Sequence, residues 1–220
     1  MNCLKQLENG IFATEADLLA LKKRKNARLL VFSDSHGDHT VVSDIFRQFG
    51  STVDAAIFAG DGLYDVLHTM NNAAKYSDAM KNLPPVICMV RGNNDTSYLS
   101  SDFLEDIFIP RRAVLTVGAR TILVTHGNES HVYYSTDAVE MEAEITGANS
   151  VIYGHSHVPA ENMHVIYSMN PGSCSYPRRR SPRSCAVLEI QGRNIFSIFY
   201  SIETGIKTKF IPYHPERLIY

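Results

Sequence analysis

The fold of this chain is decided by the stretch Leu29-Leu30-Val31-Phe32-Ser33-Asp34-Ser35-His36-Gly37-Asp38, where an apolar run stops at a polar cluster. Four consecutive apolar residues are typical of a strand that is buried on both faces, as in a parallel sheet. After the polar cluster, apolar residues recur at helical spacing, which predicts a helix with one core-facing stripe. The members of that stripe are Val41, Val42, Ile45, Phe46 and Phe49. The stretch therefore predicts a strand, a polar loop and a helix in succession.

The same pattern occurs twice more along the chain. Residues 55–58 predict a second strand, which ends at Gly60-Asp61-Gly62 and is followed by a predicted helix over about 64–81. Residues 85–90 predict a third strand, which ends at Gly92-Asn93-Asn94-Asp95. This β-α-β-α-β order favours a largely parallel central sheet.

The rest of the chain is richer in predicted strands. The patterns predict a helix over 14–25 capped by Thr14, a hairpin of 113–117 and 121–125 around Gly118, a helix near 137–146, strands near 150–153 and 164–168, and a late strand pair of 185–190 and 195–200. No internal repeat or linker interrupts these elements. The sequence therefore predicts an α/β fold in a single domain over 1–220, with residues 1–27 as a helical extension.

Composition and charge limit the class of protein. The chain has 220 residues, 45% of them hydrophobic, and a formal net charge of -2, so it can bury a core and has no overall pull toward nucleic acid or anionic membrane. Its four cysteines are scattered, which suits buried thiols in a reducing compartment. No signal peptide or membrane-spanning apolar run is evident. We therefore expect a cytoplasmic protein.

Metal-capable side chains follow the predicted strands at five places. They are Asp34 with His36, Asp61, Asn93, His126, and His155 with His157. Because ligands gather beyond the carboxyl ends of the strands in open α/β sheets, we expect these side chains to meet at one edge. Two carboxylates, one amide and four imidazoles suit Mn, Fe, Zn, Ni or Co better than Ca or Mg alone.

Seven protein ligands are too many for one ordinary metal site but fit two metal ions that share a bridging carboxylate. Two cations roughly 3.5–4 Å apart can generate hydroxide near neutral pH and stabilise both oxygens of an in-line displacement. The set therefore predicts phosphoryl chemistry, with hydroxide attacking phosphorus. Each segment alone has a structural alternative, since Asp34 and Asp61 could cap helices and Asn93 could occupy a turn. The order of all five after successive strands favours the metal site, and the imidazoles of His155 and His157 offer little to a core.

The ordered motifs resemble those of the calcineurin-like metallophosphoesterase superfamily, and within it the small bacterial and archaeal phosphodiesterase branch. The matching segments are Asp34-Ser35-His36-Gly37, Gly60-Asp61, Gly92-Asn93-Asn94-Asp95, Thr125-His126-Gly127, Gly154-His155-Ser156-His157, and Asn170-Pro171-Gly172-Ser173 with Pro177-Arg178. The similarity runs from about residue 28 to 200. It implies a four-layer α-β-β-α sandwich of two mixed sheets, with the metals at the strand C-terminal edge.

The resemblance also implies a role for each ligand. Asp34, His36 and His157 would bind one metal ion, Asn93, His126 and His155 would bind the other, and Asp61 would bridge them. Mn²⁺ is the first expectation for the two divalent ions, with Fe, Zn, Ni or Co as alternatives. The expected activity is hydrolysis of a small phosphoester, in the first place a phosphodiester.

Asn94 departs from the pattern of many superfamily members, which carry a histidine there to protonate the leaving oxygen or to bind phosphate. An asparagine can donate a hydrogen bond to a phosphate oxygen but cannot transfer a proton at ordinary pH. Loss of a general acid typically costs a factor of roughly 10²–10⁴ unless the leaving group is good. We therefore expect Asn94 to bind the phosphoryl group, and either substrates with stable leaving groups or proton delivery by water, His39 or His131. For these two histidines, a surface position without a role is the favoured alternative.

Arg178 begins a basic cluster that also contains Arg179, Arg180 and Arg183. Because the cluster follows the Asn-Pro-Gly-Ser turn, Arg178 would lie near the metal edge, where a guanidinium binds phosphate oxygens bidentately. A solvated loop is the alternative. Nucleic acid is not favoured as a substrate, because basic and aromatic residues do not interleave. A phosphomonoesterase or nucleotide hydrolase, and a protein-binding scaffold that retains its metals, stay open as functions, as does a homo-oligomeric state.

Overall fold

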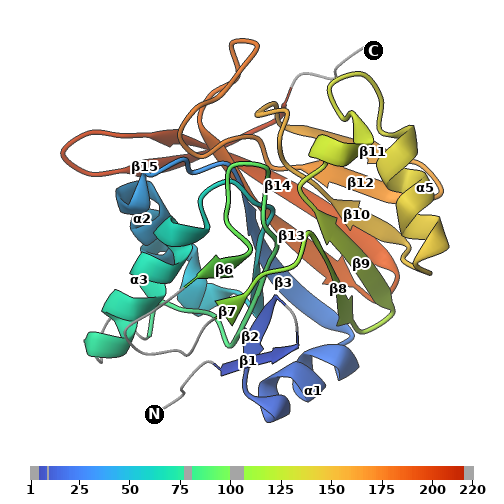
Figure 1. Ribbon diagram of the computed structural model, residues 1–220, viewed down its shortest axis with the longest axis horizontal. Helices are drawn as coiled ribbons and strands as arrows, with labels where there is room; N and C mark the ends of the chain where they lie inside the picture. The colour runs from blue at the N-terminus through green and yellow to red at the C-terminus, as the bar shows by residue number, and fades with distance from the viewer. Residues whose placement is uncertain (1–4, 9, 77–80, 100–106, 216–220) are drawn as a thin grey trace.

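The computed structural model describes residues 5–8, 10–76, 81–99 and 107–215. Two large sheets pack face to face, and helices cover the outer face of each (Figure 1). This arrangement is the four-layer α-β-β-α sandwich that the resemblance implied. The expected fold class is therefore confirmed.

The two large sheets differ in size. The eight-stranded sheet has the order β1 (Lys5–Glu8), β2 (Ile11–Ala13), β5 (Val86–Met89), β4 (Ala55–Phe58), β3 (Asn26–Phe32), β13 (Ser184–Gln191), β14 (Asn194–Glu203), β15 (Lys209–Tyr213). The five-stranded sheet has the order β11 (Ala160–Met163), β12 (Tyr167–Asn170), β10 (Ser150–Ile152), β9 (Arg120–Thr125), β8 (Arg112–Val117). A separate short ladder joins β6 (Tyr98–Leu99) to β7 (Ile107–Phe108).

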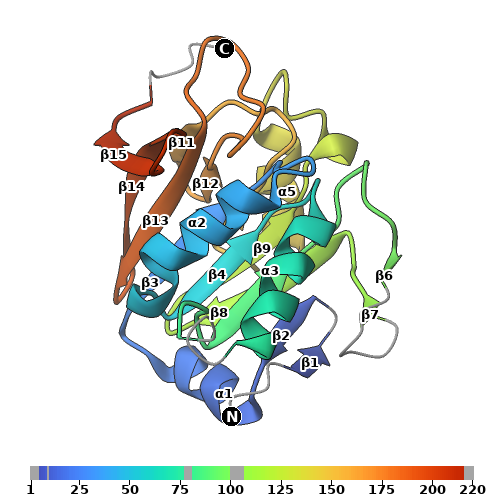
Figure 2. The same ribbon diagram turned by 90° about the vertical axis from the view of Figure 1, so that its left-hand side faces the viewer.

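The helices lie on opposite sides of the sandwich. The eight-stranded sheet is covered by α2 (His39–Phe49) and α3 (Leu63–Lys75), and the five-stranded sheet is covered by α5 (Asp137–Ile145) (Figures 1 and 2). At one end of the sandwich, α1 (Glu15–Lys23) packs against β8. Two short 3₁₀ helices are η1 (Gly50–Thr52) and η2 (Asn128–Ser130). None of the described helices is long and apolar enough to cross a membrane.

Apolar side chains form three separate cores, one between each pair of adjacent layers. Strand β3 contributes to two of these cores, because successive side chains of a strand point to opposite faces. Leu29 and Val31 lie in the core between the two sheets, whereas Leu30 and Phe32 lie in the core under α2 and α3. A strand that is buried on both faces is therefore an unbroken apolar run, as the sequence predicted.

Parallel pairing aligns the strand ends that carry the predicted ligands. In the eight-stranded sheet, β3 pairs in parallel with β4, and β4 pairs in parallel with β5. In the five-stranded sheet, β10 pairs in parallel with β9 and with β12. Each sheet therefore delivers several loops to a single carboxyl edge.

The N-terminal segment is only partly the helical extension that the sequence predicted. The helix itself is α1, and the Thr14 Oγ1 atom accepts a hydrogen bond from the Asp17 N–H at 3.1 Å, as an N-cap should. Ahead of it, β2 pairs antiparallel with β5 and extends the eight-stranded sheet. Three consecutive apolar residues are too few to show a period, so the sequence did not indicate this strand.

Other differences concern element ends and edge strands. The third helix ends at Lys75, whereas the predicted helix ran to about 81, and residues 77–80 lie outside the described part of the chain. The strand predicted near 164–168 is β12 at Tyr167–Asn170, and its antiparallel neighbour β11 was not predicted. Strand β15 was not predicted either. It contains Pro212, which lacks an N–H donor and argues against a strand unless that strand lies at a sheet edge, as β15 does.

The cysteines behave as buried thiols, in agreement with the sequence. Cys88, Cys174 and Cys185 are buried and free of disulfides, and Cys3 lies outside the described residues. Burial raises the pKa of the Cys174 and Cys185 thiols well above the ordinary range. Both thiols therefore stay protonated and unreactive near neutral pH.

Candidate metal centre

Six of the seven predicted ligands meet where the carboxyl ends of both sheets lie together, and this part of the molecule is called the metal edge. They form two groups, and in each group the metal-capable atoms lie within 4.8 Å of one another. One group is Asp34, His36 and His157, and the other is Asp61, His126 and His155. Each group combines a loop after β3 or β4 with loops after β9 or β10, so both sheets contribute to both groups. Their role as ligands stays a prediction.

The two groups approach each other at Asp61. Its Oδ2 atom lies 3.3 Å from His126 Nε2 in its own group and 3.9 Å from His36 Nε2 in the other group. Within the first group, His157 Nε2 lies 3.2 Å from Asp34 Oδ1 and 3.1 Å from His36 Nε2. A carboxylate in the position of Asp61 can reach a cation in either group, which is what the predicted bridging role requires.

Two buried polar atoms at this edge lack the partners that buried polar atoms need. Asp34 Oδ1 and His126 Nε2 are buried and make no hydrogen bond. Most buried side-chain polar atoms in proteins have at least one partner, and an unpaired one costs about 1–3 kcal/mol. A carboxylate oxygen and an imidazole nitrogen are ligands that first-row divalent metals accept. The two groups therefore fit metal ions.

Hydrogen bonds to the far nitrogen of two imidazoles turn their Nε2 atoms toward this edge. His126 Nδ1 lies 2.7 Å from the carbonyl oxygen of Ala59, and His157 Nδ1 lies 2.5 Å from the carbonyl oxygen of Tyr176. A carbonyl oxygen can only accept, so each Nδ1 carries a proton and each Nε2 is directed toward the other predicted ligands. This is the usual orientation of metal-binding histidines.

The backbone is strained at most of the predicted ligands. Five of them have left-handed φ values, namely Asp34 (56°), His36 (45°), Asp61 (59°), His155 (66°) and His157 (59°). A side chain in this region costs of the order of 1–3 kcal/mol and persists only where the surrounding structure enforces it. Such strain gathers at functional sites, and here it aims side chains of separate loops at one centre.

Two buried or half-buried carboxylates, which the sequence analysis did not single out, hold these loops. Asp95 accepts four backbone hydrogen bonds at 2.7–3.0 Å, from the N–H groups of Asp61, Gly62, Leu63 and Gly92. Asp65 Oδ2 accepts hydrogen bonds from Ser35 Oγ at 2.5 Å and from the Gly37 N–H at 2.9 Å. Asp95 could have been found from its place in the Gly92–Asp95 motif, whereas Asp65 has no such signal.

Two glycines are needed because the backbone passes very close to the predicted ligands. A Cβ atom on Gly92 would lie 2.0 Å from Asp61 Oδ1. On Gly154 it would lie 2.2 Å from Ser33 Oγ and 2.9 Å from Asp34 Oδ2. Real Cβ atoms do not approach other atoms this closely, so any larger residue would displace the two carboxylates.

Charges at this edge shift several pKa values. Burial alone would raise the pKa of Asp61, but the neighbouring His126 imidazole and the hydrogen bonds from Asn94 outweigh it and lower the pKa. Burial opposes protonation of His126, but the Asp61 carboxylate, 3.3 Å from its Nε2 atom, and the charge of Asp34 raise its pKa. Burial and the charge of His126 lower the pKa of His155 to about 4. His155 is therefore neutral near pH 7, the form in which an imidazole binds metal.

Comparison with known families settles the membership of this chain. Residues 28–193 match the family described as the calcineurin-like phosphoesterase superfamily domain. The chain belongs to this superfamily. The resemblance inferred from the ordered motifs is thereby confirmed, and the match lies within the 28–200 range of those motifs.

Individual relatives agree with this membership. The "Probable metallophosphoesterase YsnB" of Bacillus subtilis is 31% identical over 173 residues, which cover 78% of this chain and 89% of that protein. The "Phosphodiesterase YfcE" of Escherichia coli is 28% identical over 171 residues, which cover 74% of this chain and 87% of that protein. The names of both relatives support a metal-binding hydrolase of phosphoesters.

Solved structures agree as well. A conserved protein of Streptococcus pneumoniae, described as a predicted phosphoesterase, matches with a TM-score of 0.61 and 25% identity over 86% of this chain and 98% of that chain. Vacuolar Protein Sorting 29 from Cryptosporidium parvum matches with a TM-score of 0.63 and 17% identity over 87% of this chain and 99% of that chain. The second likeness concerns the fold alone.

In this superfamily member, Asn94 contacts the predicted bridging carboxylate. Its backbone N–H donates to Asp61 Oδ1 at 2.8 Å, and its Nδ2 donates to Asp61 Oδ2 at 2.6 Å. The sequence predicted a contact of Asn94 with the phosphoryl group, and the structure adds that the same side chain orients Asp61. Its neighbour Asn93, the seventh predicted ligand, is exposed on the same loop. Its ligand role stays a prediction.

Arg178 lies at the metal edge of this superfamily member. Its backbone N–H donates to the carbonyl oxygen of His157 at 3.2 Å. Its guanidinium contacts Tyr133, a residue that the sequence analysis did not single out. After burial and the charge of His126, the charge of Arg178 also helps to lower the pKa of His155.

The two histidines proposed from the sequence as proton sources lie apart from the predicted ligands. His39 packs against His68 of α3, with ring centroids 4.5 Å apart. His131 is exposed and has a left-handed φ of 52°. Within the described part of the chain, neither makes a hydrogen bond or ring contact with a predicted ligand.

Proposed function

We propose that this superfamily member is a phosphodiesterase that holds two divalent metal ions and uses a hydroxide bridging them as its nucleophile. The observation that carries the proposal is the pair of ligand groups that approach at Asp61, whose Oδ2 lies 3.3 Å from His126 Nε2 and 3.9 Å from His36 Nε2. The relatives named metallophosphoesterase and phosphodiesterase support a hydrolase of this class.

Seven side chains would hold the ions. Asp34, His36 and His157 would bind one ion, Asn93, His126 and His155 would bind the other, and Asp61 would bind both. When bound, two divalent ions lower the pKa of water and offset charge on phosphoryl oxygens. We propose Mn²⁺ first, with Fe, Zn, Ni and Co as alternatives, because a mixed oxygen and nitrogen ligand set suits all of them.

The chain's own donors would orient the substrate. Asn94 Nδ2 and the Arg178 guanidinium are hydrogen-bond donors at the metal edge. We propose that both bind phosphoryl oxygens, where negative charge grows during the reaction. Because Asn94 cannot supply a proton, the protein would act on diesters whose leaving groups need little protonation.

The test combines metal content with hydrolysis of two model esters. Elemental analysis after loading with Mn²⁺ should give close to two ions per chain, and bis(p-nitrophenyl) phosphate should be hydrolysed faster than p-nitrophenyl phosphate. A faster monoester reaction would favour a phosphomonoesterase or nucleotide hydrolase instead. Two ions without hydrolysis of either ester would favour a protein-binding scaffold. No bound metal after reconstitution would overturn the proposal.

A further inference from the structure

Tyr133 joins the basic loop to the predicted metal ligands. It follows η2 and is half-buried. Its hydroxyl donates to the carbonyl oxygen of His155 at 3.0 Å. Its ring packs against the His155 imidazole, with centroids 4.8 Å apart and planes at 62°. Tyr133 therefore contacts both the backbone and the side chain of one predicted ligand.

Arg178 completes a chain of hydrogen bonds that ends at the same ligand. Its Nη1 donates to the Tyr133 hydroxyl oxygen, and its guanidinium carbon lies 5.5 Å from the Tyr133 ring centroid. Its backbone N–H donates to the carbonyl oxygen of His157. The arginine is thus tied at both ends to the His155-Ser156-His157 segment, by its backbone directly and by its side chain through Tyr133. Such anchoring removes rotamer freedom that a bound anion would otherwise have to restrict.

The charge of Arg178 is not matched by a carboxylate. Among the described residues, no aspartate or glutamate forms an ion pair with it, and its partner Tyr133 is a neutral phenol. Arg183, five residues later in the same loop, is paired with Asp38 at 3.3 Å. The guanidinium at the metal edge therefore has no carboxylate partner among the described residues and keeps its remaining donors for a ligand, whereas Arg183 is paired with Asp38.

We propose that Tyr133 is a positioning residue that holds the Arg178 guanidinium at the metal edge, so that Arg178 binds a non-bridging oxygen of a phosphoester anion. The inference rests on the proposed function, since the phosphoester is the substrate of the same site. The Tyr133 hydroxyl donates a hydrogen bond to the carbonyl oxygen of His155 and accepts one from Arg178. Both bonds are therefore used to orient the guanidinium, and the proposal gives Tyr133 no role in proton transfer.

The decisive variant is Tyr133→Phe, which keeps the ring and removes the hydroxyl. Its matched control is Tyr134→Phe, because the neighbouring Tyr134 is 79% exposed. Both are made in the full chain loaded with Mn²⁺, and metal content, kcat, KM for bis(p-nitrophenyl) phosphate and the dissociation constant of inorganic phosphate are measured. We expect Tyr133→Phe to raise KM and the phosphate dissociation constant about tenfold, with kcat within about threefold and metal content unchanged, and Tyr134→Phe to match the wild type.

A second pair of variants checks that Tyr133 acts through Arg178. Arg178→Gln should raise the same two constants, and adding Tyr133→Phe to it should have little further effect, because residues that act as a unit are not additive. Arg179→Gln, in the same loop and exposed, is the control. Additive effects, or a Tyr133→Phe protein with unchanged constants, would overturn the inference. So would loss of metal, since Tyr133 would then act through His155.

Phosphate binding separates this inference from the proposed function. If the wild type hydrolyses neither ester, the proposed phosphodiesterase activity fails, but the phosphate dissociation constants of the five variants still measure the positioning role. If the wild type is active and Tyr133→Phe equals Tyr134→Phe in both constants, the function stands and the positioning role fails.

Discussion

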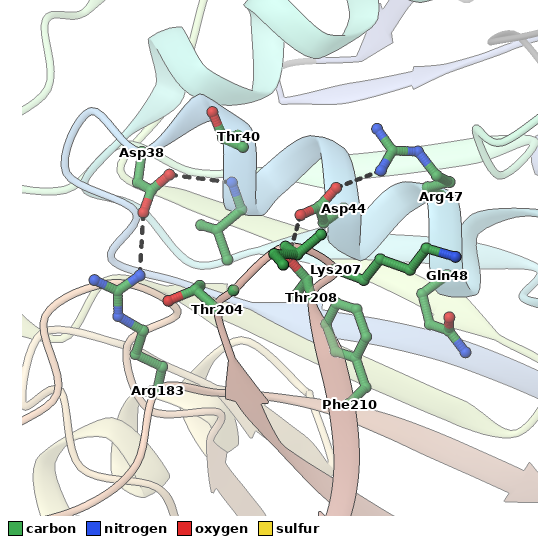
Figure 3. A pocket seen from close by; sticks show the side chains of 13 residues that line it. Asp38, Thr40, Asp44, Arg47, Gln48, Arg183, Thr204, Lys207, Thr208 and Phe210 are labelled. Atoms are coloured by element: carbon green, nitrogen blue, oxygen red, sulfur yellow. Dashed lines mark hydrogen bonds and ion pairs between the residues drawn. The ribbon is translucent and has the colours of Figure 1, made fainter.

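The metal edge and a hollow beside α2 are both rich in charged side chains. In the hollow these side chains pair with one another, whereas at the metal edge two buried polar atoms have no hydrogen-bond partner. The hollow, of about 740 Å³, lies between α2 and the β14–β15 turn (Figure 3). There Asp38 accepts from the Val41 N–H at 3.1 Å and pairs with Arg183, and Asp44 accepts from Arg47 at 2.5 Å and from the Thr208 hydroxyl. At the metal edge, by contrast, the buried Asp34 Oδ1 and His126 Nε2 atoms have no hydrogen-bond partner.

The backbone shows the same difference. Five predicted ligands have left-handed φ values, whereas no non-glycine residue that lines the hollow does. A charged cluster whose members pair with one another is complete without a ligand. A cluster that keeps unpaired buried atoms on a strained backbone is complete only with one. This contrast, rather than the size of a cavity, is why we place the function at the metal edge.

The largest effect should come from removing the carboxylate that the two ligand groups share. Asp61→Asn leaves one amide oxygen where a charged carboxylate serves both groups, so metal content should fall below two per chain. Changes around a metal site typically cost 10–100-fold, and a direct ligand should cost more than about 100-fold in diester hydrolysis. Elemental analysis and steady-state rates measure both. The control in the hollow is Asp44→Asn, and full metal content and activity in Asp61→Asn would disprove the bridging role.

The next largest effect should come from Asp95, the carboxylate that ties the loop after β4 to the loop after β5 at the metal edge. Asp95→Asn keeps one uncharged acceptor oxygen for four backbone N–H groups, so all four lose a charged partner and two lose their acceptor atom. Hydrogen bonds to charged groups contribute about 1.5–3 kcal/mol each, so the free energy of unfolding should fall by about 3 kcal/mol. Urea unfolding of the metal-free protein measures it. A loss below about 0.5 kcal/mol would show that water replaces the carboxylate.

A moderate gain in rate should come from Asn94→His, which places a proton donor at the metal edge. Asn94→His should leave metal content intact and raise turnover on diesters with poor leaving groups by about tenfold, the low end of general acid catalysis. Turnover on bis(p-nitrophenyl) phosphate should change little, because p-nitrophenolate leaves without a proton. The ratio of the two rates is the measurement. No gain on the poor leaving group would mean that another group already supplies the proton.

The smallest effect should come from the hollow. Arg183→Gln removes the partner of Asp38, but the two side chains are 34% and 31% exposed, and such pairs contribute about 0–1 kcal/mol. We expect unfolding to shift by less than about 1 kcal/mol, with metal content and diester hydrolysis unchanged. Loss of metal or a change in rate above about threefold would show that the hollow belongs to the functional site.

The metal edge was open to prediction because each candidate ligand follows an apolar run that is recognisable as a strand. Tyr133 was not, because the contacts that matter are with His155 and Arg178, and no local period links residues of separate loops. Asp65 is similar. It occupies an ordinary polar position in a helical pattern, yet it is 4% exposed and holds the Ser35–Gly37 loop. Contacts between loops follow from how the sheets pack, which periodicity alone does not describe.

The position of β3 has a consequence for when the molecule can acquire its metals. This strand pairs with β4, which follows it closely in the chain, and with β13, which comes far later in the sequence. Chains fold from the N-terminal side as they leave the ribosome. A growing chain therefore exposes Asp34, His36, Asp61 and Asn93 well before the three later histidines. That early set is rich in oxygen and suits Mg²⁺ or Ca²⁺, and the imidazoles that favour transition metals come last. With the ligand roles proposed above, a preference for a transition metal would therefore arise only after the three histidines have been added to the chain.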